Sequence, residues 1–332
     1  MELVQVDIMK KEVKIAFVDF APDFDRNNND FISILSERYN VVVDSKDPDY
    51  LFYSNFGNSY LKYDCVRIFY TGECITPDFN LCDYAMAFDR ISFGDRYLRM
   101  PLYRLFQYRK QYDKLFEREE IGEIDVNKRF CSFVVSNCFA EDIRAKMFNA
   151  LSEYKQVSSG GRYLNNVGGP IKDKYEFQTN HKFAIAFENQ QHDGYATEKL
   201  VDALAARTVP IYLGDPNIHT DLNEESFING NRYNSLEELV ERVKEVDQND
   251  ELYLQILNAN PILEDRRNND DLRTFLFNIF DQEYSNAGRR SKMHYAKEHE
   301  KFLKRYSTFD KYTYKKYKRI KNILYRITHK AI

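Results

Sequence analysis

The chain has 332 residues, and its 48 Lys and Arg against 52 Asp and Glu give a formal net charge of −4. This length suits two globular domains with a core each, and the acidic balance argues against a nucleic-acid-binding protein. The sequence has no run of eighteen apolar residues that would predict a membrane-spanning helix.

The start of the chain and its cysteines indicate the cellular compartment in which the protein is expected. The start carries acidic residues and no apolar segment typical of a signal peptide. The five cysteines contain no Cys-x-x-Cys pair, and the six histidines show no metal-site spacing. We therefore expect a protein of the reducing cytoplasm, without a disulfide framework or a metal site.

Short apolar runs alternate with a helical pattern in the first third of the chain. The runs predict buried strands at Lys14–Phe20, Val41–Val43, Tyr50–Tyr53, Cys65–Tyr70 and Tyr84–Phe88. Asp30 is expected to cap a helix that ends near Tyr39 and turns Phe31, Ile34 and Leu35 inward. This alternation predicts an open α/β sheet, with Glu73 just beyond the fourth strand.

A charged segment with a helical pattern, Arg104 to Asp125, is expected to connect two domains. We therefore predict an N-terminal domain at residues 1–125 and a second domain at residues 126–310. A basic tail at residues 311–332 follows them.

The second sheet is predicted to begin with a strand at Phe130–Val135, followed by a helix at Ala140–Tyr154. A strand at Val157 then leads into Ser158-Ser159-Gly160-Gly161-Arg162, a loop of small residues with one guanidinium. From the residues alone, this loop is either a surface turn or an anion-binding element.

The stretch from Phe183 to Gly214 is typical of one βαβ unit. Phe183–Phe187 and Val209–Leu213 are apolar runs expected of buried parallel strands, and a helix is predicted to begin near Thr197. The ligand of such a unit lies at the carboxyl end of the first strand, where N–H groups of the helix N-terminus point outward. The polar residues at this corner are Glu188, Asn189, Tyr195, Thr197, Glu198 and Lys199.

Lys199 gives this corner an unusual charge. The helix macrodipole disfavours a cation at the helix N-terminus, and a bound anion would reverse that preference. We therefore interpret the corner as a diphosphate site. The alternative is that Glu198 and Lys199 form a solvated first turn.

Three motifs with fixed spacings occupy this unit. They are Phe187-Glu188-Asn189, then Gly194-Tyr195-x-Thr197-Glu198-Lys199, and then Pro210-Ile211-Tyr212-x-Gly214. Together they resemble the donor-site signature of the α1,3/4-fucosyltransferases, glycosyltransferase family 10. The resemblance implies an α/β fold of the GT-B architecture, with two Rossmann-like domains facing a cleft and, here, a C-terminal basic amphipathic helix.

The resemblance also implies a reaction. The donor would be GDP-β-L-fucose, and the acceptor a galactosyl-N-acetylglucosamine glycan that receives fucose on O3 of GlcNAc with inversion, in Lewis-type or O-antigen structures. No cofactor is expected, and a divalent metal would at most stimulate transfer. Asp47-Pro48-Asp49 matches the metal-binding Asp-x-Asp of other glycosyltransferases, but proline before a strand favours a turn.

Catalysis is assigned to two glutamates. A sugar hydroxyl is a poor nucleophile until its proton is removed, and a positioned base contributes roughly 10²–10⁴-fold. Glu73 matches the glutamate taken as general base in the family; the alternative is a solvated carboxylate at a strand end. Glu198 would lie near the fucose, where its charge would stabilise an oxocarbenium-like transition state.

Donor binding is assigned to residues that the resemblance places at the nucleotide. Arg162 and Lys199 would neutralise the diphosphate, because a guanidinium can bind phosphate oxygens with two hydrogen bonds. Glu188 would hold the ribose hydroxyls of guanosine. The expected donor-binding residues are Arg162, Glu188, Asn189, Tyr195, Thr197 and Lys199.

Two other functions stay open. A GT-B enzyme that uses another nucleotide sugar would keep the phosphate-binding cations and differ in its base or sugar contacts. A non-enzymatic glycan-binding module on a membrane surface would account for the aromatic content and the tail, but not for the anion site.

The tail from Lys311 to Ile332 contains Lys and Arg but no Asp or Glu, and Tyr317, Ile320, Leu324 and Ile327 share one helical face. This pattern is typical of a basic amphipathic helix on an anionic membrane. It predicts peripheral attachment to the inner face of the bacterial inner membrane. A disordered basic end and a helix docked on its own protein are the alternatives.

Overall fold

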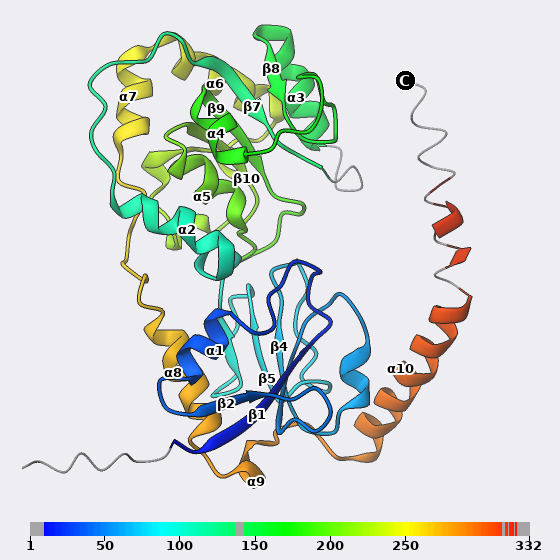
Figure 1. Cartoon of the computed structure of the whole chain (residues 1–332). Helices are drawn as coiled ribbons and strands as arrows, with labels where there is room; N and C mark the ends of the chain where they lie inside the picture. The colour runs from blue at the N-terminus through cyan, green and yellow to red at the C-terminus, as the bar shows by residue number, and fades with distance from the viewer. Residues whose placement is uncertain (1–9, 137–142, 314–315, 318, 322, 324–332) are drawn as a thin grey trace, which may run out of the picture.

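The computed structural model describes residues 10–136, 143–313, 316–317, 319–321 and 323, and its two α/β lobes lie one above the other (Figure 1). The first lobe contains a parallel sheet in the order β2-β1-β3-β4-β5-β6. Its strands are β1 Glu12–Val18, β2 Asn40–Val43, β3 Tyr50–Tyr53, β4 Val66–Tyr70, β5 Tyr84–Ala87 and β6 Tyr97–Arg99.

The second lobe contains a parallel sheet in the order β11-β10-β9-β7-β8. Its strands are β7 Arg129–Phe133, β8 Val157–Ser159, β9 His181–Phe187, β10 Val209–Leu213 and β11 Ile228–Asn229. The helices of this lobe are α3 Ile143–Tyr154, α4 Lys174–Thr179, α5 Glu198–Ala205, α6 Leu236–Gln248 and α7 Asp250–Asn258. Helix α2, Arg109–Asp113, lies in the connection between the lobes (Figure 1).

The predicted α/β architecture of two Rossmann-like domains is confirmed. Every strand that the sequence predicts is present, with bounds shifted by at most two residues. The sequence analysis missed β6 and β11, because neither three nor two residues form a recognisable apolar run. The predicted start of the second lobe's first helix, at Ala140, lies outside the described residues.

Helix α1, Asp30–Leu35, differs from its prediction at both ends. Its cap is Asn29, whose side-chain oxygen accepts hydrogen bonds from the backbone N–H groups of Phe31 and Ile32 at 3.1 and 3.2 Å. Asp30 instead accepts from the backbone N–H of Phe106 at 2.7 Å. The helix ends at Leu35, and the hydroxyl of Tyr39 bonds the carboxylate of Asp281.

The predicted boundaries of the second domain do not match the packing. Helices α8, Asp270–Phe280, and α9, Tyr284–Ala287, pack in the core of the first lobe. The ring of Phe280 stacks on that of Tyr50 with centroids 4.1 Å apart. The apolar face of α8 covers a side of the first sheet, and burying that face favours the return of the chain to this lobe.

The end of the predicted first domain also packs elsewhere. Tyr103, Tyr112 and Leu115 belong to a core cluster that includes Leu200 and Leu204 of α5. The connection therefore forms part of the second lobe's core, although we predicted that residues up to 125 belong to the first domain.

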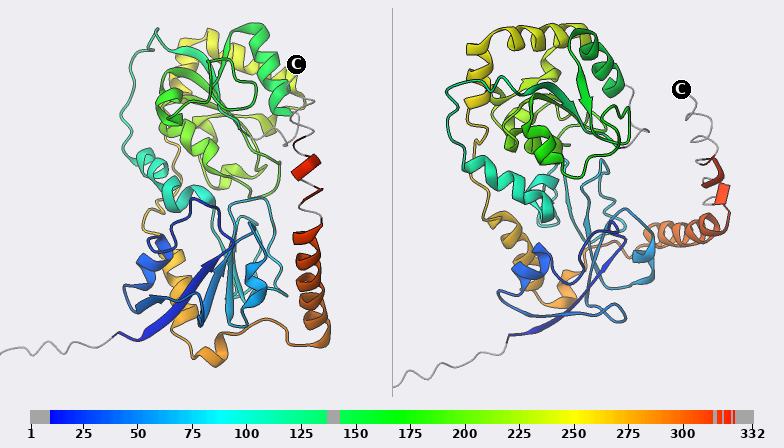
Figure 2. Two further views of the ribbon diagram at one scale, coloured as in Figure 1. Left: turned by 45° about the vertical axis from the view of Figure 1, so that its right-hand side comes forward. Right: turned by 45° about the horizontal axis from the view of Figure 1, so that its top comes forward.

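Helix α10, His294–Tyr312, begins well before the predicted start of the tail. Its first turns are fixed to the first lobe by an ion pair of 2.9 Å between Glu300 and the buried Arg67, and by Ala296, which is 5% exposed. The later turns of α10 project away from both lobes in Figure 1 and in the right-hand view of Figure 2.

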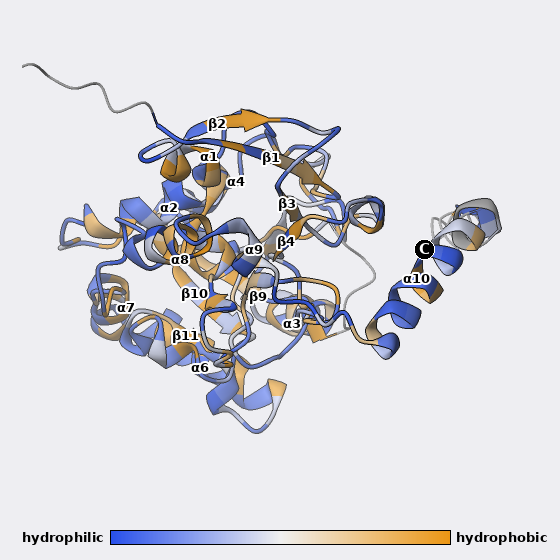
Figure 3. Cartoon of the chain, turned by 90° about the horizontal axis from the view of Figure 1, so that it is seen from below, coloured by the Kyte–Doolittle hydropathy of each residue, from blue (hydrophilic) through white to orange (hydrophobic). Residues whose placement is uncertain are grey.

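The later part of the tail lies mostly outside the described residues, including Leu324 and Ile327. The described residues 316–317, 319–321 and 323 are helical. Figure 3 shows hydrophilic and hydrophobic segments alternating along this outlying helix. Among the described residues, no helix has the length and hydropathy to cross a bilayer.

Candidate active site

The predicted βαβ corner is present between the end of β9 and the start of α5. Glu188 follows β9, and its side chain is fully buried. Its carboxylate accepts hydrogen bonds from the backbone N–H of Thr197 at 2.6 Å and from the Thr197 hydroxyl at 2.7 and 2.9 Å. A carboxylate at this place satisfies an N–H group at the helix N-terminus and interacts favourably with the helix dipole.

Lys199 completes this arrangement. Its ammonium group lies 2.7 Å from a Glu188 oxygen and 2.9 Å from the Thr197 hydroxyl, and its side chain keeps 19% exposure. Burial lowers the pKa of Lys199, but the charges of Glu188 and Glu198 outweigh that effect, and the pKa is raised. Lys199 therefore carries its positive charge, and the carboxylate of Glu188 is the anion beside it.

The predicted contact between Glu188 and ribose is wrong for this arrangement. Both oxygens of the carboxylate are engaged within the protein, and none of the side chain is exposed. The role of Glu188 is to hold Thr197 and Lys199 in place.

Glu198 and Asn189 are the chain neighbours of Lys199 and Glu188. Burial raises the pKa of Glu198, but Lys199 and Lys174 lower it by more, so this carboxylate stays ionised. Asn189 accepts a hydrogen bond of 3.2 Å from the guanidinium of Arg144, a residue with 2% exposure on α3. The sequence analysis missed Arg144; an arginine within the inward face of a helix was the available signal.

Arg162 is exposed on the loop after β8. Among the described residues it has no hydrogen-bond or ion-pair partner. The preceding residue, Gly161, approaches the backbone so closely that a Cβ atom there would lie 1.9 Å from the carbonyl oxygen of Val135. The glycine therefore lets this loop lie against the end of the strand segment beyond β7.

Tyr195 lies where the two lobes meet. It is 1% exposed, and its ring contacts that of Phe88 from the first lobe with centroids 5.2 Å apart. Burial raises the pKa of Tyr195, and the charges of Glu188, Glu73 and Glu198 raise it further. Glu73 of the first lobe thus acts on the same hydroxyl group as two carboxylates of the second lobe.

Glu73 follows β4, as predicted, and is exposed. The Thr71 hydroxyl orients its backbone by accepting from the Glu73 N–H at 3.0 Å, and that hydroxyl in turn donates to Asn55 at 2.8 Å. Glu73 lines a cavity of about 450 Å³ in the first lobe. Tyr108 lines the same cavity, and burial and then the charge of Glu198 raise its pKa. The cavity therefore holds the predicted base together with Tyr108, which lies just before helix α2.

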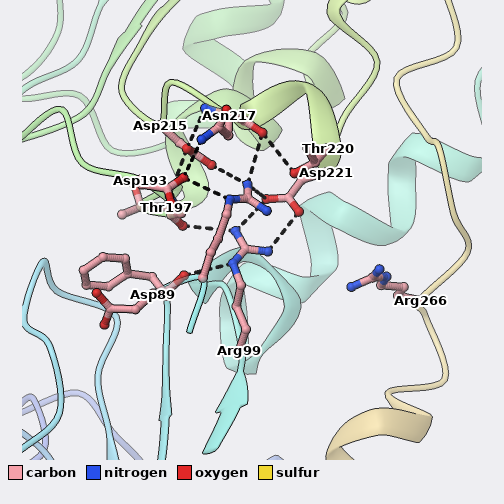
Figure 4. Close-up of polar contacts among 12 residues, drawn as sticks. Asp89, Arg99, Asp193, Thr197, Asp215, Asn217, Thr220, Asp221 and Arg266 are labelled. Carbon is pink, nitrogen blue, oxygen red and sulfur yellow. Dashed lines mark hydrogen bonds and ion pairs between the residues drawn. The ribbon is translucent and has the colours of Figure 1, made fainter. Parts of the chain in front are cut away.

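Two arginines join the lobes beside this corner (Figure 4). Arg99 of β6 pairs with the carboxylate of Asp221 at 2.6 Å and donates to the carbonyl of Gly194 at 3.1 Å. Arg90 pairs with Asp215 at 2.6 Å and with Asp221 at 3.0 Å. The sequence analysis missed these contacts because their partners are distant in the chain, although Asp215 directly follows the third donor motif.

Metal ligands were expected to be absent. Within the part of the chain that the structure describes, no group of three or more His, Cys, Asp or Glu side chains could hold a metal ion. Asp47 and Asp49 flank a turn between β2 and β3, as the proline predicted.

Two family descriptions match the chain. Residues 15–106 match the alpha-(1,3)-fucosyltransferase FucT N-terminal domain, and residues 124–260 match the C-terminal part of glycosyltransferase family 10 (fucosyltransferase). Alpha-(1,3)-fucosyltransferase FucT of Helicobacter pylori is 36% identical over 266 residues, which make up 69% of this chain and 55% of that protein.

A human protein is similar over a shorter stretch. The 4-galactosyl-N-acetylglucosaminide 3-alpha-L-fucosyltransferase 9 of Homo sapiens is 36% identical over 142 residues, or 42% of this chain and 39% of that protein. The chain thus spans 55% and 39% of the length of these two relatives.

Solved structures are similar over most of the chain. A crystal structure of an alpha1,3-fucosyltransferase matches with a TM-score of 0.71 and 30% identity, over 82% of this chain and 91% of that one. A structure of alpha1,3-fucosyltransferase with GDP-fucose matches with a TM-score of 0.66 and 29% identity, over 85% of this chain and 95% of that one.

Proposed function

The chain belongs to glycosyltransferase family 10, and we propose that it transfers L-fucose from GDP-β-L-fucose to O3 of GlcNAc in an N-acetyllactosamine-type glycan. One similar structure is of an alpha1,3-fucosyltransferase with GDP-fucose, and the human relative's name specifies a 4-galactosyl-N-acetylglucosaminide. The observation that carries the proposal is that the donor corner contacts the lobe that holds Glu73: the ring of Tyr195 packs against that of Phe88 at 5.2 Å, and Arg99 donates to the Gly194 carbonyl at 3.1 Å. The proposed base and the proposed donor corner therefore meet between the lobes.

Glu73 acts as the general base in this reaction. Its carboxylate takes the proton from O3 of the acceptor as that oxygen attacks the anomeric carbon of fucose, opposite the diphosphate. The new glycosidic bond forms while the bond from carbon to phosphate oxygen breaks, and GDP leaves with that electron pair. The anomeric configuration is inverted, so a single base is sufficient.

Lys199 and Arg162 neutralise the charge that develops on the leaving diphosphate. Lys199 is held protonated beside Glu188, and Arg162 is exposed on the loop after β8. Each charge-assisted hydrogen bond to a phosphate oxygen contributes about 1.5–3 kcal/mol. These cations and the N-terminus of α5 supply the stabilisation for which many enzymes use a metal, so transfer needs no cofactor and a divalent ion would at most stimulate it.

Glu198 faces the sugar in this proposal, because its ionised carboxylate stabilises positive charge on the fucose ring in the transition state. Asn189, Tyr195 and Thr197 contact the donor. Thr197 is the N-cap residue of α5, and both its backbone N–H and its hydroxyl donate to Glu188.

We further propose that the protein attaches to the inner face of a bacterial inner membrane through its C-terminal helix. Tyr306, Phe309, Tyr317 and Ile320 are each at least half exposed and recur at helical spacing. Basic residues lie among them, a combination that favours an anionic lipid surface.

A transfer assay tests the proposed reaction. GDP-fucose is supplied with type 1 and type 2 galactosyl-N-acetylglucosamine disaccharides, and the linkage of the product is determined by NMR. We expect an α1,3 linkage on the type 2 disaccharide. Competition by GDP, but not by UDP or ADP, would support the donor assignment, and equal competition by all three would contradict it.

A further inference from the structure

The cavity beside Glu73 has an aromatic wall. The rings of Phe20 and Phe24 stack with centroids 4.0 Å apart, and the ring of Phe106 meets that of Tyr70 edge to face at 5.3 Å. Such rings present large apolar faces of negative potential, against which the C–H face of a sugar packs well.

Tyr70 adds a polar group beneath this wall. Its side chain lines the cavity, and its buried hydroxyl has no hydrogen-bond partner among the described residues. A buried hydroxyl without a partner is costly, and a sugar hydroxyl can both donate to it and accept from it. The cavity is therefore suited to an uncharged carbohydrate.

The charges at the cavity have one sign. Asp23, Asp25, Asp30 and Glu73 line it, whereas no Lys, Arg or His appears among the described residues that do so. The three aspartates accept only from uncharged donors. These donors are the backbone N–H groups of Asn27, Asn28 and Phe106 and the side-chain amide of Gln107. Within the described ranges, no Lys or Arg side chain lies within hydrogen-bond distance of the three aspartates to offset the negative charge that they add to Glu73.

We propose that this cavity selects acceptors that carry no negative charge and rejects otherwise identical acceptors with a carboxylate or sulfate on the galactose. The inference rests on the proposed function, since it makes the cavity the acceptor subsite. Like charges in partly desolvated surroundings repel, and this repulsion is screened by salt. The acidic wall thus determines which glycans approach the base.

The test compares kcat/KM for N-acetyllactosamine with those for the same disaccharide carrying a sulfate or an ammonium group on galactose. At low ionic strength we expect the sulfated acceptor to be used at least about tenfold less well than the neutral one, and the difference to narrow with salt. The ammonium-bearing acceptor, similar in size, should not show this loss, which separates charge from steric exclusion.

A double variant then locates the selectivity. Asp23→Asn with Asp25→Asn keeps the shapes and acceptor oxygens of both side chains and removes two charges. It should raise the ratio of sulfated to neutral kcat/KM at least about fivefold. The matched control changes the exposed Glu123 and Glu153 to Gln, removing the same charge far from the cavity, and should leave the ratio unchanged.

The outcomes separate this inference from the proposed function. No transfer to any neutral acceptor would overturn the proposed function. Two outcomes would overturn the charge selectivity and leave the proposed function intact. One is efficient transfer to the neutral acceptor with an equal kcat/KM for the sulfated acceptor. The other is an equal change in the ratio of sulfated to neutral kcat/KM in the aspartate variant and in the control variant.

Discussion

The ammonium group of Lys199 lies 2.7 Å from the carboxylate of Glu188, which is buried between the end of β9 and the start of α5. The ion pair fixes the position of the lysine and keeps it charged before any donor binds. A diphosphate that reaches Lys199 meets a cation whose geometry is already set. Such preorganisation lowers the free-energy cost of binding.

Lys199→Ala should weaken GDP and GDP-fucose binding by the same factor, because the lost contact lies on the diphosphate that both share. A charge-assisted contact of about 1.5–3 kcal/mol corresponds to a loss of at least about tenfold in affinity. Calorimetric titration with GDP and with GDP-fucose measures this loss of affinity. Lys199→Arg keeps the charge beside Glu188 and serves as the control. Unchanged GDP affinity in a folded Lys199→Ala protein would show that the phosphate role is wrong.

Gly194→Ala should destabilise the contact between the lobes. Gly194 has φ +81°, and a Cβ atom there would lie 2.4 Å from the carbonyl oxygen of Phe88 in the first lobe. Strain of this kind costs about 1–3 kcal/mol before the clash is counted, and denaturant unfolding measures it. Gly94→Ala is the matched control, since Gly94 also has a positive φ but no atom within 4 Å of its added Cβ. If both variants lose the same free energy of unfolding, the close approach of Gly194 to Phe88 does not contribute to the loss.

The sequence predicted what is local. An apolar run such as Phe183–Phe187 predicts a buried strand whatever its neighbours in the fold are. The strands of both sheets and the βαβ corner were therefore predictable. The return of α8 to the first sheet was not, because its apolar face fits either lobe equally well by pattern alone. The pair between Glu188 and Lys199 was missed for a similar reason: eleven positions separate the residues, and only the folded corner brings them together.

Glu300→Gln should loosen the base of α10 at neutral pH. Burial raises the pKa of Glu300, but the hydrogen bonds and charges of Arg67 and Lys304 together lower it by more, to below the usual 4.5. A lowered folded-state pKa means that this carboxylate stabilises the docked helix above about pH 4.5, and that the stabilisation is lost as pH falls through the lowered pKa. Hydrogen exchange of residues 294–312 should therefore be faster in the variant at pH 7.

Hydrogen exchange of wild type and Glu300→Gln is also compared at acidic pH, where the result can contradict the prediction. Once the pH falls below the lowered pKa of Glu300, the wild-type carboxylate is protonated, so wild type and variant should converge. Lys297→Gln, on the same helix and without an ion pair among the described residues, is the control. A difference at pH 7 that persists unchanged in acid would mean that the Arg67–Glu300 charge pair is not its cause.

Deletion of residues 311–332 should release the protein from anionic vesicles and leave transfer to soluble acceptors largely intact. Basic residues near an anionic surface contribute about 1 kcal/mol each, and the tail carries one sign of charge. Cosedimentation with vesicles that contain phosphatidylglycerol measures binding, and vesicles of phosphatidylcholine alone are the control. Equal cosedimentation of full-length and truncated chains would remove the tail as the anchor.

Glu73→Gln separates catalysis from binding. Gln keeps the size of the side chain but cannot accept the acceptor's proton, so turnover should fall by at least about a hundredfold, the lower end expected for losing a general base. GDP-fucose affinity should scarcely change, because Glu73 belongs to the first lobe and the Glu188–Lys199 pair to the second.

Two measurements test the assignment of Glu73 as the general base. Single-turnover transfer and donor titration are run on the same folded protein, with Glu12→Gln, an exposed glutamate at the far end of β1, as the control. A variant that keeps wild-type turnover, or that loses donor affinity in proportion to rate, would show that Glu73 is not the base.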